Sequence, residues 1–519
     1  VLFRSNSEYT NARGTGFISE DKSQRYLSAA TNIAWMQGGR EEWAMNSYFA
    51  RLDYSFGDRY LLSANFRTDG SSKFAKGNRW GYFPSVSGGW RISEESFFET
   101  LKEKAIQNLK LRASWGKLGN QDMGSNYPTK VLIANTTDND GYNTVFGSTE
   151  TAGFGRYEST LANPDLKWEV TTQTDLGLDI SFLNKFDFGF DYFIKKSSDV
   201  LLEIPVPSLA GVDGGMMVNA AEVRNRGFDM NLSYNTKVKD FNISAYGNFS
   251  KVKNEVLSMG TGNRNMFTSS YRGTNITRTR VGEPIAHFYG YKNGGVFKSQ
   301  EEIDTYVNEK GEKIQPAAKV GDLKFLDLDG NGKIDSNDQT NIGSGFPDFT
   351  YGLGADLEYK GFDLSFFFQG VAGYDIFNAI KYEGMFVDPR YNQFAAILDR
   401  YHPTNNPGGN GPRVTIKDTN NNRRMSDYYV DKGDYLRLKT LTLGYTFNRN
   451  TIKKLGLQKL RVYATVQNLL TFTSYKGFDP ELGETYANEL DSYGVTEIGV
   501  DRGQFPQPRT FIMGVNINF

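Results

Sequence analysis

The sequence predicts an all-β protein, an antiparallel transmembrane β-barrel, and three observations support that prediction. Apolar residues recur at every second position in one segment after another, which is the period of a β-strand. These segments run about 9–14 residues, longer than a usual strand and close to the length of a tilted membrane strand. The connections between them alternate between short and long, as in outer-membrane barrels.

The expected strands divide apolar from polar side chains cleanly. In residues 186–195, for example, Phe188 and Phe190 share one face, while Asp187 and Asp191 lie on the other. A barrel with lipid outside and water inside requires such a division. In chain order, about thirteen strands are expected, at 47–56, 59–67, 80–92, 108–116, 170–183, 186–196, 223–236, 241–250, 348–359, 361–370, 435–447, 459–472 and 507–519.

The connections predict which ends of the strands share a side of the membrane. Short links are expected at 57–58, 184–185, 237–240 and 360–361, with a somewhat longer one at 448–458 and a short helix capped by Ser93 in 93–107. Long links are expected at 117–169, 197–222, 251–347, 371–434 and 473–506. Outer-membrane barrels place tight turns on the periplasmic side and long loops outside the cell.

The domain organisation follows from these strands. Residues 1–46 are expected to be an incomplete loop and strand region, and residues 47–519 the C-terminal part of the barrel, with an extracellular insert at 251–347. The chain opens at Val1 without an initiator Met or a signal peptide, so we interpret it as the C-terminal portion of a longer precursor. Strands 47–56 and 507–519 are then expected to be unpaired sheet edges.

A large soluble β-sandwich or solenoid is the alternative fold. Its apolar rows would be buried in a two-layer core, whereas the barrel leaves them facing lipid. No fixed repeat of about 20–50 residues marks a solenoid. The burial of the Phe and Leu rows is therefore the observation that separates the two folds.

Composition excludes several functions. The net charge is −1, so no basic surplus supports a nucleic-acid partner. Cys is absent, and the two His residues, His287 and His402, lie far apart in the sequence, so thiolate, imidazole-metal and triad chemistry are not expected. A surface glycan hydrolase would need two carboxylates about 5–10 Å apart in a cleft, and the sequence identifies no such pair. The chain is not expected to be an enzyme.

Residues 327–338 carry the pattern of a calcium-binding loop. Oxygen ligands are expected from Asp327, Asp329, Asn331, Asp335 and Asp338, at positions 1, 3, 5, 9 and 12, with the carbonyl of Lys333 at position 7. Gly332 at position 6 allows the sharp turn. Asp replaces the usual Glu at position 12, which favours weaker binding of Ca2+. The alternative is a polar turn without a metal.

Several stretches resemble the SusC/RagA family of TonB-dependent outer-membrane transporters. The resemblance spans about residue 45 to Phe519. It is carried by Phe346–Gly354, Tyr359–Ser365, Phe368–Gly370, Gly433–Lys439 with Thr442–Tyr445, Val466–Phe472, Gly477–Glu481, Arg79–Ser85 and Asn163–Glu169.

The resemblance implies a barrel of about 22 strands in the bacterial outer membrane. Its early strands and its N-terminal plug domain would lie outside this sequence. It also implies import of oligosaccharides or peptides, a SusD-like surface lipoprotein as partner, and energy from the TonB complex through the missing N-terminal region. The alternative is a non-energised outer-membrane barrel or a surface adhesin with calcium-braced loops. A plug domain and TonB box upstream would favour the importer.

Overall fold

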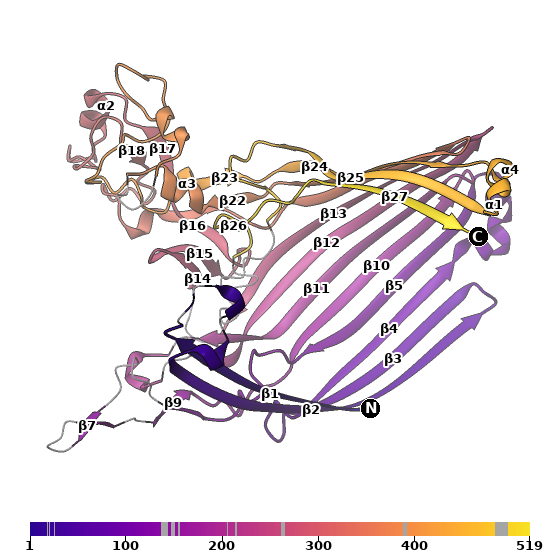
Figure 1. Ribbon diagram of the computed structural model, residues 1–519, viewed down its shortest axis with the longest axis horizontal. Helices are drawn as coiled ribbons and strands as arrows, with labels where there is room; N and C mark the ends of the chain where they lie inside the picture. The colour runs from indigo at the N-terminus through magenta and orange to yellow at the C-terminus, as the bar shows by residue number, and fades with distance from the viewer. Residues whose placement is uncertain are drawn as a thin grey trace. The chain divides into compact units, whose positions relative to one another are not determined.

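A computed structural model describes every residue of the chain except 18, 20, 25, 136–143, 147–150, 154–155, 205, 213–214, 261–264, 388–391 and 483–496. Its main element is a 14-stranded sheet in the order β1-β2-β3-β4-β5-β10-β11-β12-β13-β20-β21-β24-β25-β27, whose strands are labelled in Figure 1. The pairings that can be followed residue by residue in it are antiparallel. Among the described residues, no helix combines the length and the apolar character needed to cross a membrane.

All the expected strands are present in this sheet. Their bounds are β2 (Asn32–Phe56), β3 (Tyr60–Ser71), β4 (Trp80–Arg91), β5 (Ile106–Asn120), β10 (Glu169–Phe182), β11 (Phe186–Ile204), β12 (Met216–Val238), β13 (Phe241–Met259), β20 (Phe349–Tyr359), β21 (Phe362–Ala372), β24 (Tyr435–Thr446), β25 (Lys459–Thr473) and β27 (Thr510–Asn518).

One strand of the sheet was not expected. Strand β1 (Leu2–Thr15) pairs with the first half of β2, from Leu2 opposite Asn46 to Thr15 opposite Asn32. The prediction that strand 47–56 is a sheet edge is therefore wrong for its first residue, because Ser47 donates its N–H to the carbonyl of Val1 at 2.8 Å. Strand β27 is the last in the strand order, as expected.

The short connections are tight turns. Lys360 and Gly361 form the two-residue link from β20 to β21, with φ angles of 47° and 91°. The link from β2 to β3 has three residues, of which Gly57 and Asp58 have φ angles of 57° and 53°. Positive φ at both central residues is the geometry whose twist matches that of a two-residue hairpin. We call this end of the strands the short-turn end and the opposite end the long-loop end.

The helical segment expected in 93–107 is present, but its α-helical part begins only at Glu99. It consists of two 3-10 turns, η3 (Ile92–Glu94) and η4 (Ser96–Phe98), followed by α1 (Glu99–Lys104). Phe98 is the N-cap of α1, and Ser93 is buried with no hydrogen-bond partner for its hydroxyl among the described residues. The prediction that Ser93 caps the helix is wrong.

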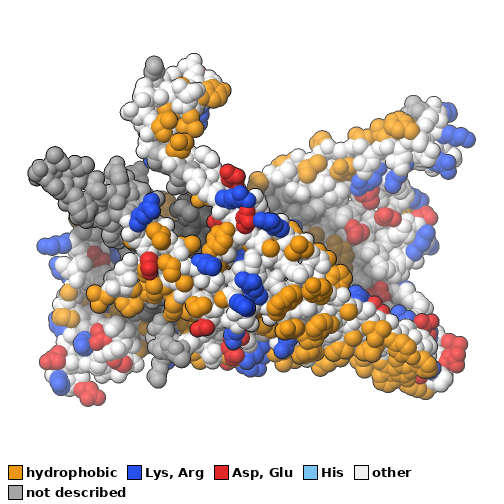
Figure 2. Space-filling model, turned by 90° about the horizontal axis from the view of Figure 1, so that it is seen from below, with side chains coloured by type: hydrophobic (Ala, Val, Ile, Leu, Met, Phe, Trp, Pro, Cys, Tyr) orange, Lys and Arg blue, Asp and Glu red, His pale blue; other side chains and the backbone are white. Residues whose placement is uncertain are grey.

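The apolar rows of the long strands face outward. Leu353, Phe362 and Leu443 on β20, β21 and β24 are 57%, 56% and 54% exposed, and Leu52 on β2 is 63% exposed. Figure 2 shows hydrophobic side chains gathered over a broad area at the lower right of the molecule, with charged side chains at its margins. A soluble sandwich would bury these rows, so the barrel prediction is confirmed.

The chain divides into two compact units. The first comprises Val1–Gly88, Ala113–Thr174 and Lys195–Glu222. Its core lies at the long-loop end and contains Phe74, Phe83, Met123, Leu166 and Trp168. The remaining elements of this unit are η1 (Lys22–Gln24), η2 (Leu27–Ala29), β6 (Leu132–Asn135), β7 (Thr144–Phe146), β8 (Thr151–Gly153), β9 (Arg156–Thr160) and η5 (Ser208–Ala210).

The second unit comprises Gly89–Arg112, Asp175–Ile194 and Val223–Phe519. Its long connections pack into small sheets around aromatic cores. These connections contain β14 (Asn265–Tyr271), β15 (Thr274–Arg280), β16 (His287–Tyr291), β17 (Asn293–Val296), α2 (Gln300–Thr305), β18 (Leu323–Phe325), η6 (Ser336–Asp338), β19 (Gln339–Gly343), β22 (Asp375–Asn378), α3 (Ala379–Gly384), η7 (Ala395–Asp399), η8 (Asp427–Tyr429), β23 (Val430–Lys432) and β26 (Val500–Asp501). The link between β24 and β25, at the short-turn end, contains α4 (Arg449–Ile452) and η9 (Lys453–Leu455).

Candidate functional site

A groove runs along the polar face of strands β3, β4 and β5 in the first unit. Two cavities of about 420 and 340 Å³ share Arg67, Phe83 and Leu118 and so form one continuous depression, which we call the Arg67 groove. It begins at the long-loop end, where Asp69 and Gln121 lie, and continues toward the middle of the strands. Its lining also includes Met45, Asn65, Ser85, Val86, Ser87, Ser114, Trp115, Gly116, Lys117, Gly119, Asn120, Trp168 and Gln173.

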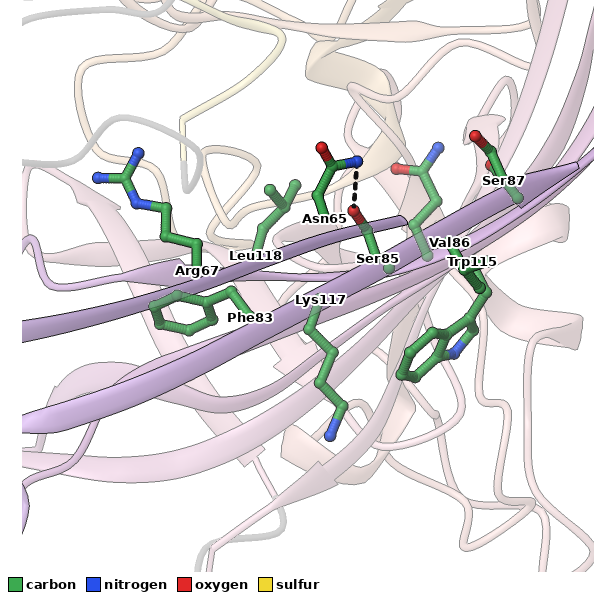
Figure 3. A pocket seen from close by; sticks show the side chains of 12 residues that line it. Asn65, Arg67, Phe83, Ser85, Val86, Ser87, Trp115, Lys117 and Leu118 are labelled. Carbon is green, nitrogen blue, oxygen red and sulfur yellow. Dashed lines mark hydrogen bonds between the residues drawn. The ribbon is translucent and has the colours of Figure 1, made fainter. Parts of the chain in front are cut away.

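The alternation of the strands decides which side chains enter the groove. Figure 3 shows Asn65, Arg67 and Ser85 extending from one side of the strands, and Trp115 and Lys117 from the other. The amide of Asn65 donates a hydrogen bond to the hydroxyl of Ser85 at 3.3 Å, which joins β3 to β4 on the groove side. The wall is therefore rich in hydroxyl and amide groups.

An ion pair lies at the long-loop end of the groove. Nε of Arg67 donates to both carboxylate oxygens of Asp69, at 3.0 and 2.8 Å. The Asp69 side chain is 7% exposed and that of Arg67 is 51% exposed, so the carboxylate is held inside while the guanidinium extends outward. The buried carboxylate of Asp69 therefore orients the exposed guanidinium of Arg67.

The floor of the groove is aromatic and tightly packed. The ring of Phe83 lies 5.4 Å from that of Trp168, whose Nε1–H donates to the carbonyl of Arg79 at 2.9 Å. Gly81 and Gly119 permit this arrangement, because a Cβ at either position would come within 2.3 and 2.1 Å of the Phe83 ring. Phe83 and Trp168 are therefore fixed in the lining of the cavity that also holds the ion pair.

The calcium-like loop brings three of its four predicted carboxylate ligands together. Single carboxylate oxygens of Asp327, Asp329 and Asp338 all lie within 4.8 Å of one another. Oxygens that share one calcium ion at about 2.3–2.6 Å must lie within about 5 Å of each other, so this spacing fits the ion. Among the described residues, no Lys or Arg forms an ion pair with these three carboxylates. Their negative charge is available to a cation.

The fourth predicted carboxylate, Asp335, is not part of this cluster. Asp335 accepts the N–H of Asn337 at 2.8 Å and pairs with the Nζ of Lys333 at 3.1 Å. The Asn337 N–H, with Lys333, lowers the pKa of Asp335. The amide of Asn331 points its nitrogen at Asp329 and Asp335, at 3.0 and 3.1 Å. Asp335 and Asn331 therefore hold the shape of the loop here.

Asp338 differs from the other two clustered carboxylates because it is fully buried. It accepts backbone N–H groups from Leu328 at 2.8 Å and from Asp335 at 2.7 Å, one on each oxygen. The same contacts form a capping box at the start of η6. The negative charge is thus fixed by the fold of the loop itself.

A third cavity lies in the second unit, among its long connections. It measures about 460 Å³ and is lined by Tyr271, Arg272, Glu383, Phe394 and Arg502, among others. Its arginines are already paired: Arg272 with Glu383, and Arg502 with Glu497 at 2.5 Å. This cavity therefore presents little free charge to a ligand.

The two histidines lie apart from these sites. His287 is fully buried, with its Nε2 2.6 Å from Glu283 and 3.3 Å from Nε of Arg278. Burial lowers the pKa of His287, and Arg278 and Arg280 add to that effect while Glu283 opposes it. His402 accepts backbone N–H groups from Thr404 and Asn405 through Nδ1. Both histidines have structural partners.

The sequence did not reveal the Arg67 groove as a site. The alternation of residues 59–67 puts Asn65 and Arg67 on the polar face of their strand, but it does not show that Gln121 and Trp168 line the same cavity. The available signal was a charged pair two residues apart at the end of a strand, Arg67 and Asp69, followed by an aromatic strand start at Trp80.

The geometry defines a class of protein: a β-barrel with an apolar outer face, a polar inner face and folded long loops. The profile described as "TonB dependent receptor-like, beta-barrel" matches residues 3–469. TonB-dependent receptor P3 of Formosa agariphila is 34% identical over 514 residues, which cover 98% of this chain and 49% of the relative. TonB-dependent receptor SusC of Bacteroides thetaiotaomicron is 31% identical over 479 residues, which cover 91% and 43%.

A solved structure shares the fold. The structure titled as the RagAB peptide transporter aligns with a TM-score of 0.81 at 23% identity and covers all of this chain and 52% of that one. This chain belongs to the TonB-dependent receptor-like β-barrel family, and the resemblance to SusC/RagA is confirmed. Members of this family are outer-membrane proteins, and the relatives found are receptors and transporters rather than enzymes. The chain spans about half the length of these relatives.

Proposed function

We propose that this chain is the C-terminal barrel portion of a bacterial outer-membrane importer that takes up oligosaccharides or peptides with energy from TonB. The observation that carries the proposal is the family match over residues 3–469, together with the exposed apolar rows of the sheet. The relative SusC, a TonB-dependent receptor, and the RagAB peptide transporter support an import role. The substrate and the SusD-like lipoprotein partner are parts of the proposal.

The polar inner face suits such cargo. On β21 and β25, Arg461 pairs with Asp363 across Gly444, where a side chain would come within 2.5 Å of the carboxylate. In the same manner, Arg112 on β5 pairs with Asp191 on β11 across Gly177 of β10, where a side chain would meet the Asp191 carboxylate. Because these charged side chains of the inner face pair with one another, the hydroxyl and amide groups of that face are available for transient hydrogen bonds with sugar hydroxyls or peptide groups.

The test is uptake by cells that carry the full-length protein. A strain lacking the gene, the same strain complemented, and a strain lacking TonB are given fluorescently labelled oligosaccharide and peptide mixtures. Accumulation that requires both the gene and TonB is expected. Accumulation that requires the gene but not TonB would indicate a passive barrel, and surface attachment without accumulation would indicate an adhesin.

The calcium-like loop is a second part of the proposal. Asp327, Asp329 and Asp338 would hold one calcium ion and so brace the connection that leads through β19 to strand β20. The convergence of three carboxylates without a basic partner supports it, because a divalent cation would offset their repulsion. Calcium titration of the full-length protein, followed by calorimetry, tests it, and no heat of binding at millimolar calcium would exclude it.

A further inference from the structure

The Arg67 guanidinium keeps most of its hydrogen-bonding capacity. Arginine has five N–H donors, and only the Nε–H is used, toward Asp69. Among the residues that the structure describes, the Nη1 and Nη2 groups have no partner. A guanidinium anchored through Nε presents the other two nitrogens as a planar fork, and that fork matches the two oxygens of a carboxylate.

A second group in the groove also lacks a partner. The Oε1 atom of Gln121 is buried and accepts no hydrogen bond from any described residue, while its Nε2 lies 3.8 Å from the sulfur of Met45. A buried acceptor without a donor carries a desolvation cost. Gln121 and Arg67 line the same cavity, so a ligand N–H or O–H that reaches Oε1 there would relieve that cost.

The charge of the groove selects the kind of anion. Arg67 and Asp69 together are neutral, and Lys117 extends from the opposite side of the strands in Figure 3. A dianion such as a phosphate would meet the Asp69 carboxylate without a second positive charge to balance it. A singly charged carboxylate fits, because the geometry of the fork contributes as much as its charge.

We propose that the Arg67 groove is a subsite that binds a carboxylate group of the imported substrate. The Arg67 fork holds the two carboxylate oxygens, and Gln121 Oε1 accepts a neighbouring N–H or O–H. The inference rests on the proposed import function and narrows its substrate class to carboxylate-bearing fragments. The carboxylate belongs either to an oligopeptide terminus or to a uronic acid unit of an oligosaccharide.

The aromatic floor explains why the fork would be ready for a ligand. Phe83 and Trp168 pack against each other in the same cavity as the ion pair, and the Trp168 indole is fixed by its bond to the Arg79 carbonyl. Asp69 in turn holds the plane of the guanidinium. A fork that is oriented before binding loses less rotamer entropy when the carboxylate arrives.

The experiment measures binding to the full-length protein purified in detergent. Four probes are compared by titration calorimetry: a hexapeptide with a free C-terminal carboxylate, the same peptide amidated, trigalacturonate, and the neutral trisaccharide maltotriose. One acidic probe is expected to bind at least tenfold more tightly than its neutral counterpart. Arg67→Gln should abolish that preference, and Arg67→Lys should reduce it, because an ammonium group has the charge but not the fork. Arg51→Gln, at an arginine that pairs with Asp53 on β2 and does not line the groove, should leave it unchanged.

The outcomes assign the source of the carboxylate or overturn the subsite. Preference for the free peptide terminus identifies peptides, and preference for trigalacturonate identifies uronate glycans. No preference for either acid, or a preference that survives Arg67→Gln, overturns the proposal. Gln121→Met, which leaves both charges in place, should also weaken binding and covers the case in which the Arg67 variants do not fold. TonB-dependent uptake without a carboxylate preference would remove only the subsite, whereas the preference without uptake would remove the import function.

Discussion

The guanidinium of Arg437 on β24 lies 2.5 Å from the carboxylate of Asp479, and both side chains are almost fully buried, at 3% and 8% exposure. The same carboxylate accepts the backbone N–H of Gln507 at 2.9 Å, and Arg437 also donates to the hydroxyl of Thr471 at 2.9 Å. One buried pair therefore joins two neighbouring strands to both ends of the long connection between β25 and β27.

Replacing Arg437 by Met should destabilise the protein strongly. Removing one partner of a buried ion pair leaves the other charge uncompensated and costs about 3–5 kcal/mol. We expect a marked fall in the thermal unfolding temperature of the full-length protein and faster proteolysis of the connection after Thr473. Lys439→Met is the matched control, because its pair with Glu481 is more exposed, at 25% and 24%, and should contribute about 1 kcal/mol or less. Equal losses in the two variants would refute this account.

The two faces of β24 offer a direct test of the membrane assignment. Leu443 belongs to the apolar row and is 54% exposed, whereas its neighbour Thr442 hydrogen-bonds to Thr465 on the polar face. Leu443→Arg should destabilise the barrel in lipid vesicles by about 2–4 kcal/mol if the residue lies near the bilayer midplane, and less toward an interface. Thr442→Arg should cost clearly less. Urea unfolding in vesicles measures the stability of both variants. A larger loss of stability in Thr442→Arg than in Leu443→Arg would contradict the assignment of the apolar face to lipid.

The long strands could be predicted from the sequence because lipid and water impose a strict alternation on them. Strand β1 could not, because Leu2–Thr15 is exposed along most of its length and has no single apolar face. The short strands within the long connections escaped for a different reason. Strands such as β14 and β16 have register shifts against their partners, and these interrupt the period of two.

The calcium-like loop and the Arg67 groove also differ in how far the sequence predicts them. The calcium-like loop is local in sequence, so its clustered carboxylates Asp327, Asp329 and Asp338 could be predicted from spacing alone. The contacts of Asp335 could not, because spacing alone does not show that its side chain caps η6 and pairs with Lys333. The Arg67 groove depends on the packing of Trp168 and the approach of Gln121, which only the folded chain determines.

The buried His287 predicts how stability responds to acid. Its pKa is lowered in the folded state, chiefly by burial, so between that value and the unfolded value of about 6.5 the unfolded chain binds more protons. Stability should therefore fall as the pH drops below about 6.5. Thermal unfolding at pH 7.5 and pH 5 measures the difference.

Two substitutions separate His287 from other acid-sensitive groups. His287→Gln should make the difference in unfolding temperature smaller, because the neutral amide does not titrate. Glu283→Gln should make it larger, because Glu283 is the neighbour that favours the protonated imidazole. If His287→Gln leaves the pH difference as it is in the wild type, the acid response arises elsewhere.

Calcium removal should destabilise the connection that contains Asp327, Asp329 and Asp338. A ligand that binds only the folded state at about 100 times its dissociation constant adds about 2.7 kcal/mol, so calcium should raise the unfolding temperature and a chelator should lower it. Asp338→Asn should weaken calcium binding at least tenfold, because it removes the charge that the backbone of the loop already holds in place. Asp304→Asn is the matched control, since Asp304 on α2 pairs with Lys313 and lies outside the cluster. Calorimetric titration of the three proteins measures the effect, and equal affinities in Asp338→Asn and the wild type would show that calcium, if bound, is held elsewhere.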